Sequence, residues 1–334
     1  MSDQYTFKDF KSEAEIRWCP GCGDIAIIKA VQTAFAKMNR PKEEFAIISG
    51  IGCSSRFPYY MSNYGFHTIH GRAGAVASGV KLANPYLSVW QVTGDGDALA
   101  IGGNHFIHEI RRNLDINVLL FNNQIYGLTK GQYSPTSKFG QVTKSSPYGT
   151  IEHPFNPGPL AIGAGTTFFA RSFDVNVDQN VDIMLDMDKH KGIGIFEILQ
   201  NCVIFNDGAY KKYTDKETRE DMQLYVKHGE KMIFGKNKDK GIILDNNFRL
   251  KVVKIGENGI TEKDILVHDA HNPSPILHYE LAEMVDPIVT GIIRMVELPT
   301  YETELYKQID AVSQKSKIKS FDDLLFSGST WKVD

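Results

Sequence analysis

Short apolar runs alternate with longer amphipathic stretches through the middle of the chain. The runs are rich in Val, Ile, Leu and Phe, which is typical of strands buried on both faces of a sheet. Alternation of such strands with helices predicts an α/β fold with a mainly parallel sheet flanked by helices. The predicted strands are Phe45–Ser49, Leu87–Thr93, Ile116–Phe121, Thr167–Ala170 and Ile193–Leu199, and the predicted helices between them are Gly74–Leu82, Ala98–Leu114 and Val181–His190.

Two regions depart from this rhythm. The stretch 131–159 is rich in Gly, Pro, Ser, Thr and Lys and has no periodicity. A loop of that length inside a compact domain is usually functional, unless it hides an element that the pattern does not reveal. After Cys202 the chain becomes more charged and then ends in a short apolar section and a helix-like tail. We therefore predict one domain over residues 1–210 and a C-terminal extension over residues 211–334.

Composition narrows the classes of protein that fit. The chain has 334 residues, a formal net charge of −3, 42% apolar and 23% charged residues, as folded globular proteins do. No block of Lys and Arg suggests a nucleic-acid surface, and no apolar run reaches the roughly 18–20 residues that span a bilayer. The first eighteen residues are polar and mixed in charge, so we expect no targeting peptide and a cytoplasmic location.

A Gly-Asp-Gly-Asp turn at residues 94–97 directly follows a predicted strand and precedes a predicted helix. Ligands of open α/β sheets bind at that end of the strands, and glycines allow the backbone to approach a phosphate. An aspartate there repels phosphate unless a cation lies between them. The turn therefore indicates Mg²⁺ bridging a carboxylate and a diphosphate.

Asn123 follows the next strand, 28 residues after Asp95, so both side chains are expected at neighbouring strand ends. An amide oxygen and a nearby backbone carbonyl suit an octahedral Mg²⁺. A lone Gly-Asp-Gly or Asn-Asn is usually an ordinary turn, but the two at this spacing favour a cofactor site. A nicotinamide-type Gly-x-Gly-x-x-Gly is absent from the sequence.

The two turns together resemble the thiamine-diphosphate motif. The resemblance implies that Mg²⁺ is held by Asp95, Asn123 and the carbonyl of Ile125. It also implies a set of residues around the diphosphate, which are Gly94, Gly96, Asp97, Gly127, Leu128 and Thr129.

The four cysteines follow the spacing Cys-x2-Cys-x30-Cys-x148-Cys, at Cys19, Cys22, Cys53 and Cys202. Four thiolates suit a tetrahedral zinc as well as an iron–sulfur cluster. Zinc ribbons usually carry two close Cys-x-x-Cys pairs, whereas here the third cysteine follows a strand whose end faces the predicted cofactor. This favours an electron-carrying [4Fe-4S] cluster, with a zinc site or unrelated thiols as alternatives.

Several motifs together resemble the β subunit of 2-oxoacid:ferredoxin oxidoreductases, particularly the 2-oxoglutarate type. The resemblance covers about residues 16–207 and weakens beyond residue 210, although residues 267–275 still look similar to the family. The motifs are WCPGCG (18–23), GIGCSS (50–55), TIHGRAG (68–74), GDGD (94–97) and NNQIYGLT (122–129).

The resemblance implies roles for further residues. The four cysteines would ligate the [4Fe-4S] cluster, and residues 51–54 (Ile51, Gly52, Cys53 and Ser54) and His70 would contact thiamine diphosphate. His70 read alone is more often a structural histidine. Arg56 stands where some family members carry a lysine that handles the substrate carboxylate, so a catalytic role is predicted for Arg56 and His70, with a structural ion pair as the alternative for Arg56.

By the same resemblance the chain is a thiamine-diphosphate- and iron–sulfur-binding subunit that decarboxylates a 2-oxoacid oxidatively. The substrate would be 2-oxoglutarate, with pyruvate or a branched 2-oxoacid as alternatives, and the products acyl-CoA and CO2, with electrons passing to ferredoxin. An α subunit would supply the acid that activates the coenzyme, in an αβ or (αβ)2 complex. The competing hypotheses are a non-oxidative thiamine-diphosphate decarboxylase or acyl-transferase subunit with a structural zinc site, and a non-catalytic interaction subunit organised by zinc.

Overall fold

The main sheet of the computed structural model, which describes residues 5–333, has eight strands in the order β2-β1-β3-β4-β6-β5-β11-β7. The pairs from β2 to β5 are all parallel, β11 is antiparallel to β5, and β7 is parallel to β11. The strands are β1 Phe45–Ser49, β2 Tyr64–His67, β3 Ser88–Gly94, β4 Ile116–Asn122, β5 Phe168–Phe173, β6 Gly194–Leu199, β7 Gln223–Val226 and β11 Ile288–Met295.

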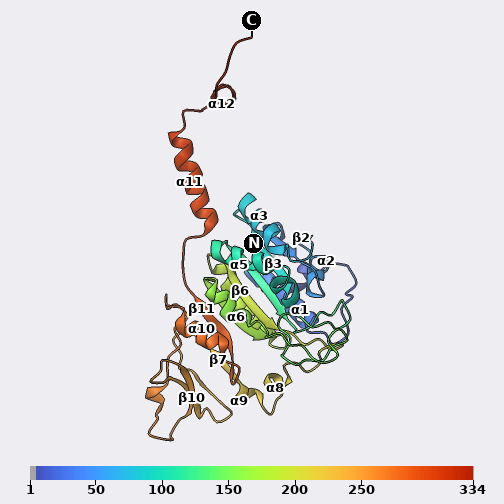
Figure 1. Ribbon diagram of the computed structural model, residues 1–334, viewed down its shortest axis with the longest axis vertical. Coiled ribbons are helices and arrows are strands. Elements are labelled where there is room, and N and C mark those ends of the chain that lie inside the picture. Colours follow the sequence, from blue (N-terminus) through green and yellow to red (C-terminus); the bar gives the residue numbers. More distant parts are fainter. Residues whose placement is uncertain (1–4, 334) are drawn as a thin grey trace.

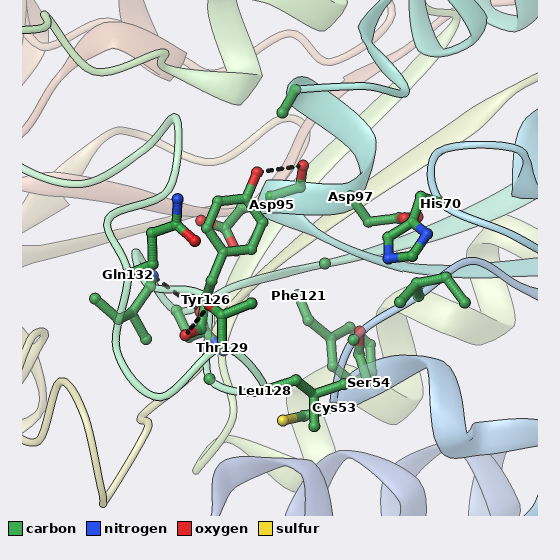
Figure 2. Close-up of a pocket in the computed structure, with 18 of the residues that line it drawn as sticks. Cys53, Ser54, His70, Asp95, Asp97, Phe121, Tyr126, Leu128, Thr129 and Gln132 are labelled. Carbon is green, nitrogen blue, oxygen red and sulfur yellow. Dashed lines mark hydrogen bonds between the residues drawn. The ribbon is translucent and has the colours of Figure 1, made fainter. Parts of the chain in front are cut away.

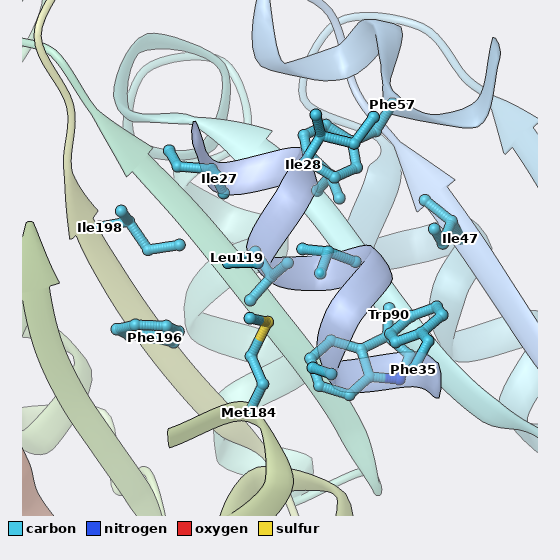
Figure 3. Packing of buried hydrophobic residues seen from close by; sticks show 14 of the residues in the cluster. Ile27, Ile28, Phe35, Ile47, Phe57, Trp90, Leu119, Met184, Phe196 and Ile198 are labelled. Carbon is cyan, nitrogen blue, oxygen red and sulfur yellow. The ribbon is translucent and has the colours of Figure 1, made fainter. Parts of the chain in front are cut away.

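The central strands are apolar throughout because both of their faces are covered. Along β4, Leu119 and Phe121 pack into one core cluster, and the intervening Val118 and Leu120 pack into the other. This period of two, with apolar residues in both phases, is why each strand reads as a continuous hydrophobic run. Figure 3 shows part of the first cluster, in which Phe35 of the long helix Gly23–Met38 packs against Trp90 of β3, with their ring centroids 5.2 Å apart.

Helices cover the two faces of the sheet. Residues of α1 and α7 belong to the first cluster, and residues of α3, α5, α6 and α10 belong to the second. The helices are α1 Gly23–Met38, α2 Phe57–Tyr60, α3 Ala73–Ala83, α4 Asp95–Leu99, α5 Gly103–Arg112, α6 Pro157–Gly163, α7 Val177–Lys189, α8 Lys211–Thr214, α9 Arg219–Met222, α10 Ile276–Glu283, α11 Tyr301–Lys315 and α12 Phe321–Leu325.

The segment after residue 210 is tied to the main sheet. It supplies β7 and β11, together with a small antiparallel sheet of β8 Ile233–Phe234, β9 Lys240–Leu244 and β10 Leu250–Lys254. The chain then leaves the body, and α11 and α12 project away from it (Figure 1). The root of this C-terminal arm is held by Glu302, whose carboxylate accepts a hydrogen bond from the Asp115 N–H at 3.3 Å.

The mainly parallel sheet flanked by helices is confirmed, and the five predicted strands are present. One helix prediction needs correction, and one long helix was missed. The predicted helix 98–114 is two helices, α4 and α5, because the chain bends at Gly102, where a Cβ would lie 2.4 Å from the carbonyl oxygen of Asp97. Helix α1 was not predicted, because most of its circumference is buried and its solvent-facing stripe, Ile25, Lys29, Thr33 and Lys37, is only one residue wide.

The stretch predicted to be irregular, residues 131–159, is mostly a loop. Between the end of β4 and the start of α6 at Pro157 the chain contains no helix or strand among the described residues, and only isolated bridges such as the one between Tyr126 and Gln132. The prediction of a long loop is therefore confirmed up to residue 156. None of the helices within residues 5–333 is both long and apolar enough to cross a membrane.

Candidate active site

A cavity of about 410 Å³ opens at the carboxyl ends of β1, β3 and β4. Every residue that the sequence assigned to thiamine diphosphate or Mg²⁺ lines this cavity, although the residues come from four separate segments. The lining residues are Ile51, Gly52, Cys53, Ser54, His70, Gly94, Asp95, Gly96, Asp97, Ala100, Ile101, Phe121, Asn123, Ile125, Tyr126, Gly127, Leu128, Thr129 and Gln132. Figure 2 shows most of them around the cavity.

Asp97 fixes the turn that carries His70. One carboxylate oxygen of Asp97 accepts a hydrogen bond from the Gly71 N–H at 2.7 Å, and the other accepts one from the Thr93 hydroxyl at 2.9 Å. The carboxylate of Asp97 is therefore used within the protein. Its effect is to hold the His70 turn against the 94–97 turn at the cavity.

Asp95 is 2% exposed and is held by the long loop. Its Oδ2 atom accepts hydrogen bonds from the Ser134 hydroxyl at 2.6 Å and from the Thr136 hydroxyl. Burial raises the pKa of Asp95, whereas these two hydroxyl donors lower it. A buried carboxylate with a raised pKa gains stability from a cation, so this position suits a bound metal.

Asn123 and Ile125 form a compact turn after β4. The side-chain oxygen of Asn123 accepts a hydrogen bond from the Ile125 N–H at 3.1 Å, and the Asn123 carbonyl accepts one from the Asn206 side chain at 2.9 Å. Together with Asp95, this corner offers carboxylate, amide and backbone oxygens to one cavity. Oxygen donors of these three kinds are the ligands that Mg²⁺ prefers.

Arg56 does not line the main cavity. It lies in a neighbouring cavity of about 420 Å³ that also contains Arg17, Tyr59 and His67. The two cavities share Ile51, Gly52 and Leu128 in their linings. Arg56 is therefore next to the predicted coenzyme site and separated from it by this short wall.

All four cysteines line one further cavity, of about 140 Å³, and all four are free thiols. They arrive from three distant segments: the turn before α1, the residue that caps the 3₁₀ helix Ser54–Arg56 after β1, and the loop after β6. Within residues 5–333 there is no group of three or more His, Cys, Asp or Glu side chains arranged to hold a metal ion. The four thiols nevertheless share one cavity.

Burial makes a negative charge on these sulfurs costly. It raises the pKa of Cys53 to about 12, with Asp24 and the neighbouring Cys202 and Cys19 adding to the shift and Arg56 opposing it. It also raises the pKa of Cys22, where Asp24 again adds to the effect. Thiolates in this cavity consequently need a cationic partner, which the chemistry of a bound metal or cluster supplies.

The cavity lined by the cysteines and the cavity that holds Asp95 share a wall. Cys53, Asn123, Gly127 and Leu128 line both of them. A Cβ atom on Gly127 would lie only 3.3 Å from the sulfur of Cys53, so the backbone at this wall is in contact with a candidate cluster ligand. Groups bound in the two cavities would be separated by the thickness of about one residue.

Several lining residues escaped the sequence analysis. Tyr126 lies inside a motif that was singled out, and its hydroxyl donates to the Gly96 carbonyl at 3.0 Å, across the cavity rim (Figure 2). Ser134 and Thr136, which are outside the lining and hold Asp95 from behind it, belong to the loop that was predicted to be functional, but no spacing links them to Asp95. Ala100, Ile101, Phe121 and Gln132 complete the lining and carry no recognisable motif.

Comparison with known proteins gives consistent findings. Residues 50–198 match the family model described as "Thiamine pyrophosphate enzyme, C-terminal TPP binding domain". The 2-oxoglutarate oxidoreductase subunit KorB of Mycobacterium tuberculosis is 46% identical over 333 residues, which are 98% of this chain and 88% of that protein. A 2-oxoacid:ferredoxin oxidoreductase subunit beta of a Sulfolobus species is 42% identical over 222 residues, covering 64% of this chain and 73% of that protein.

A solved structure is similar over almost the whole chain. It is the 2-oxoglutarate:ferredoxin oxidoreductase from Magnetococcus marinus, with 2-oxoglutarate, coenzyme A and succinyl-CoA bound. The TM-score is 0.78 at 31% sequence identity, covering 97% of this chain and 96% of that one. The likeness therefore includes the C-terminal third, where the sequence motifs are sparse.

Proposed function

Since this chain belongs to the β subunits of the 2-oxoacid:ferredoxin oxidoreductases, which are enzymes, we propose that it oxidatively decarboxylates 2-oxoglutarate to an acyl-CoA and CO2, with the electrons passing to ferredoxin. The observation that carries the proposal is the wall shared by the Asp95 cavity and the four-cysteine cavity. It supports two cofactors that exchange electrons directly. A site for thiamine chemistry alone has no need of four thiols behind the same residues.

We propose that Asp95, Asn123 and the Ile125 carbonyl hold Mg²⁺, and that residues 94–97 and 127–129 hold the diphosphate. Residues 51–54 and His70 would contact the rest of the coenzyme. Bound thiamine diphosphate supplies an electron sink for the decarboxylation. The chain's own contribution is to fix the cation through Asp95, whose carboxylate the 131–156 loop holds through Ser134 and Thr136.

For the four cysteines we propose a [4Fe-4S] cluster, which accepts one electron at a time. The four thiols line one cavity that shares a wall with the Asp95 cavity, which supports an electron-carrying cluster over a structural zinc. All residues lining the two cofactor cavities precede residue 210, so we propose residues 1–210 as the cofactor-binding part and residues 211–334 as an extension that adds β7 and β11 to the same sheet.

The 2-oxoglutarate proposal rests on the names of the relatives and on charge. The cavity beside the coenzyme site contains Arg56 and His67, together with Arg17, whose guanidinium is paired with Glu15 of the same cavity at 2.7 Å. 2-Oxoglutarate has a second carboxylate that pyruvate lacks, and an arginine fork binds carboxylates in bidentate fashion. We propose that Arg56 binds a substrate carboxylate. His70 lines the coenzyme cavity and not the cavity of Arg56, and we propose that it acts on the coenzyme.

We also propose that the chain acts with an α subunit, in an αβ or (αβ)2 complex in the cytoplasm. The carboxylates that line the main cavity are Asp95 and Asp97, and both accept hydrogen bonds from their own neighbours. The acid that activates the coenzyme is therefore expected from the α subunit. The Magnetococcus enzyme was solved with coenzyme A bound, which supports coenzyme A as the acyl acceptor here.

The test is anaerobic purification of the co-expressed complex, with iron and sulfide assays and a panel of 2-oxoacids that reads the reduction of a viologen dye. We expect about four irons per β chain, a broad visible absorbance, and fastest reduction with 2-oxoglutarate when coenzyme A is present. A colourless complex that holds zinc and releases CO2 without reducing the dye would contradict the proposal and favour the non-oxidative alternative. Full activity after Asp95→Ala would contradict the coenzyme site itself.

A further inference from the structure

The side chain of Gln200 lies against one of the four sulfurs. Its Nε2 atom is 3.3 Å from the Sγ atom of Cys22 and also donates to the Asn201 carbonyl at 2.7 Å. Within residues 5–333, this is the one side-chain hydrogen bond to a cysteine sulfur. Gln200 is 1% exposed and lines the same cavity as the four thiols.

The position of Gln200 is fixed from several directions. Its backbone N–H continues the ladder between β6 and β4 by donating to the Asn122 carbonyl at 2.9 Å. Its side chain packs against Gly23, where a Cβ would lie 2.8 Å from Gln200 Cγ and 2.0 Å from a carboxylate oxygen of Asp174. The amide is therefore held at Cys22 by the end of a buried strand and by a glycine that leaves room for it.

The surroundings of this amide are otherwise acidic. Asp24 is 1% exposed with both carboxylate oxygens lacking a hydrogen-bond partner, and Asp174 accepts from the Asn201 N–H at 2.8 Å. Trp18 donates to the Cys53 carbonyl and not to its sulfur. Two N–H groups lie at the Cys22 sulfur, the side-chain amide of Gln200 and the backbone N–H of Asp24, and Gln200 supplies the one that comes from a side chain.

We propose that the Gln200 amide donates an N–H···S hydrogen bond to the Cys22 sulfur and thereby raises the reduction potential of the cluster that the four cysteines hold. This inference rests on the proposed function. On reduction the cluster takes up one electron, the sulfurs become more negative, and a hydrogen-bond donor stabilises the reduced form more than the oxidised form. No bond to Gln200 forms or breaks, so Gln200 is a positioning residue and not a catalytic one.

The test compares Gln200→Leu with Gln32→Leu in the co-expressed, iron-loaded complex. Gln32 is a buried glutamine of α1 whose amide donates to the Tyr60 carbonyl at 3.4 Å, away from the sulfurs, and it controls for the loss of a buried amide. Reduction by dithionite is followed by potentiometry with EPR detection. We expect Gln200→Leu to shift the equilibrium about five- to tenfold toward the oxidised cluster, tenfold being about 59 mV for one electron, and Gln32→Leu to leave it unchanged.

An unchanged midpoint potential in an iron-replete Gln200→Leu complex overturns the inference. If that variant loses its iron, the wild-type complex labelled with ¹⁵N in the glutamine side-chain amide decides. Pulsed EPR of the reduced cluster then shows a ¹⁵N hyperfine coupling if the hydrogen bond exists, and its absence rejects the bond. A wild-type complex without iron overturns both this inference and the proposed function, whereas an active wild type with no effect of Gln200 overturns this inference alone.

Discussion

Thr136 is the residue through which the long loop meets the proposed metal corner. Its hydroxyl donates to Asp95 Oδ2 and lies 3.0 Å from the side-chain oxygen of Asn122. Valine has nearly the same shape and no hydroxyl, so Thr136→Val removes this contact and keeps the volume. Asp95 then retains Ser134 as its hydroxyl donor.

The expected magnitude follows from the chemistry of these partners. A hydrogen bond to a charged group contributes about 1.5–3 kcal/mol, and loss of an outer partner of a metal ligand typically costs about 10–100-fold in metal affinity. We therefore expect Thr136→Val to weaken Mg²⁺-dependent coenzyme binding by about 10–100-fold. Removing a donor also raises the pKa of Asp95 further, so protons compete better with the cation and the loss should be larger at pH 6 than at pH 8.

The assay strips the co-expressed complex with a chelator and then titrates Mg²⁺ at a fixed concentration of thiamine diphosphate, following intrinsic fluorescence. Thr143→Val is the matched control, because the Thr143 hydroxyl contacts Ser145 and Ser146 of the same loop. A Thr136→Val complex with wild-type Mg²⁺ affinity and thermal midpoint would refute the coupling between loop and metal.

Three further predictions follow from other sites. Cys202→Ala should remove most of the iron and visible absorbance while thiamine-diphosphate binding persists. Cys53→Ala should impair both iron content and thiamine-diphosphate binding, because Cys53 lines both cavities and Cys202 lines only one. Equal effects of the two variants on coenzyme binding in calorimetry would argue against the shared wall. Arg56→Gln should lower kcat/KM for 2-oxoglutarate by about 10–100-fold, and kcat/KM for pyruvate by less, in steady-state assays of dye reduction. An equal loss for the two substrates would show that Arg56 does not select the substrate. Glu109 is 2% exposed, and burial raises its pKa to about 8 from an ordinary 4.5. Between these pH values the Glu109 carboxyl stays protonated in the folded state and is ionised in the unfolded state. The free energy of unfolding therefore falls by about 1.4 kcal/mol for each pH unit of increase in this range. Glu109→Gln should therefore flatten the decline of the thermal midpoint from pH 5.5 to 7.5 in scanning fluorimetry, and an unchanged decline would show that Glu109 is ionised in the folded protein.

The sequence was most informative where local pattern and tertiary position coincide. Strands such as β4 are apolar in both phases, so their bounds could be read from the chain. The residues that directly follow such strands, Asp95 and Asn123, meet because parallel strands end at one edge. Strand β11 was missed, since it contains Gly291 at a positive φ and an irregular register, which interrupt the expected alternation.

The outer partners of the site required the structure. Ser134 and Thr136 reach Asp95 from about 40 positions along the chain, through a loop whose path no periodicity predicts. Gln200 likewise meets Cys22 from the far end of the domain, and only the order of the strands brings them together. Such contacts depend on how segments are assembled, which composition and spacing do not encode.

Residues 51–54 connect the two proposed cofactor sites. All four line the proposed coenzyme cavity, and Cys53 also lines the cavity of the four cysteines. With both proposed cofactors bound, a substitution of Cys53 would change a contact with the coenzyme and also remove a proposed ligand of the cluster. Variants of these four positions that are made for a new electron acceptor or for a new coenzyme analogue must therefore be tested for two properties together, cluster binding and coenzyme binding.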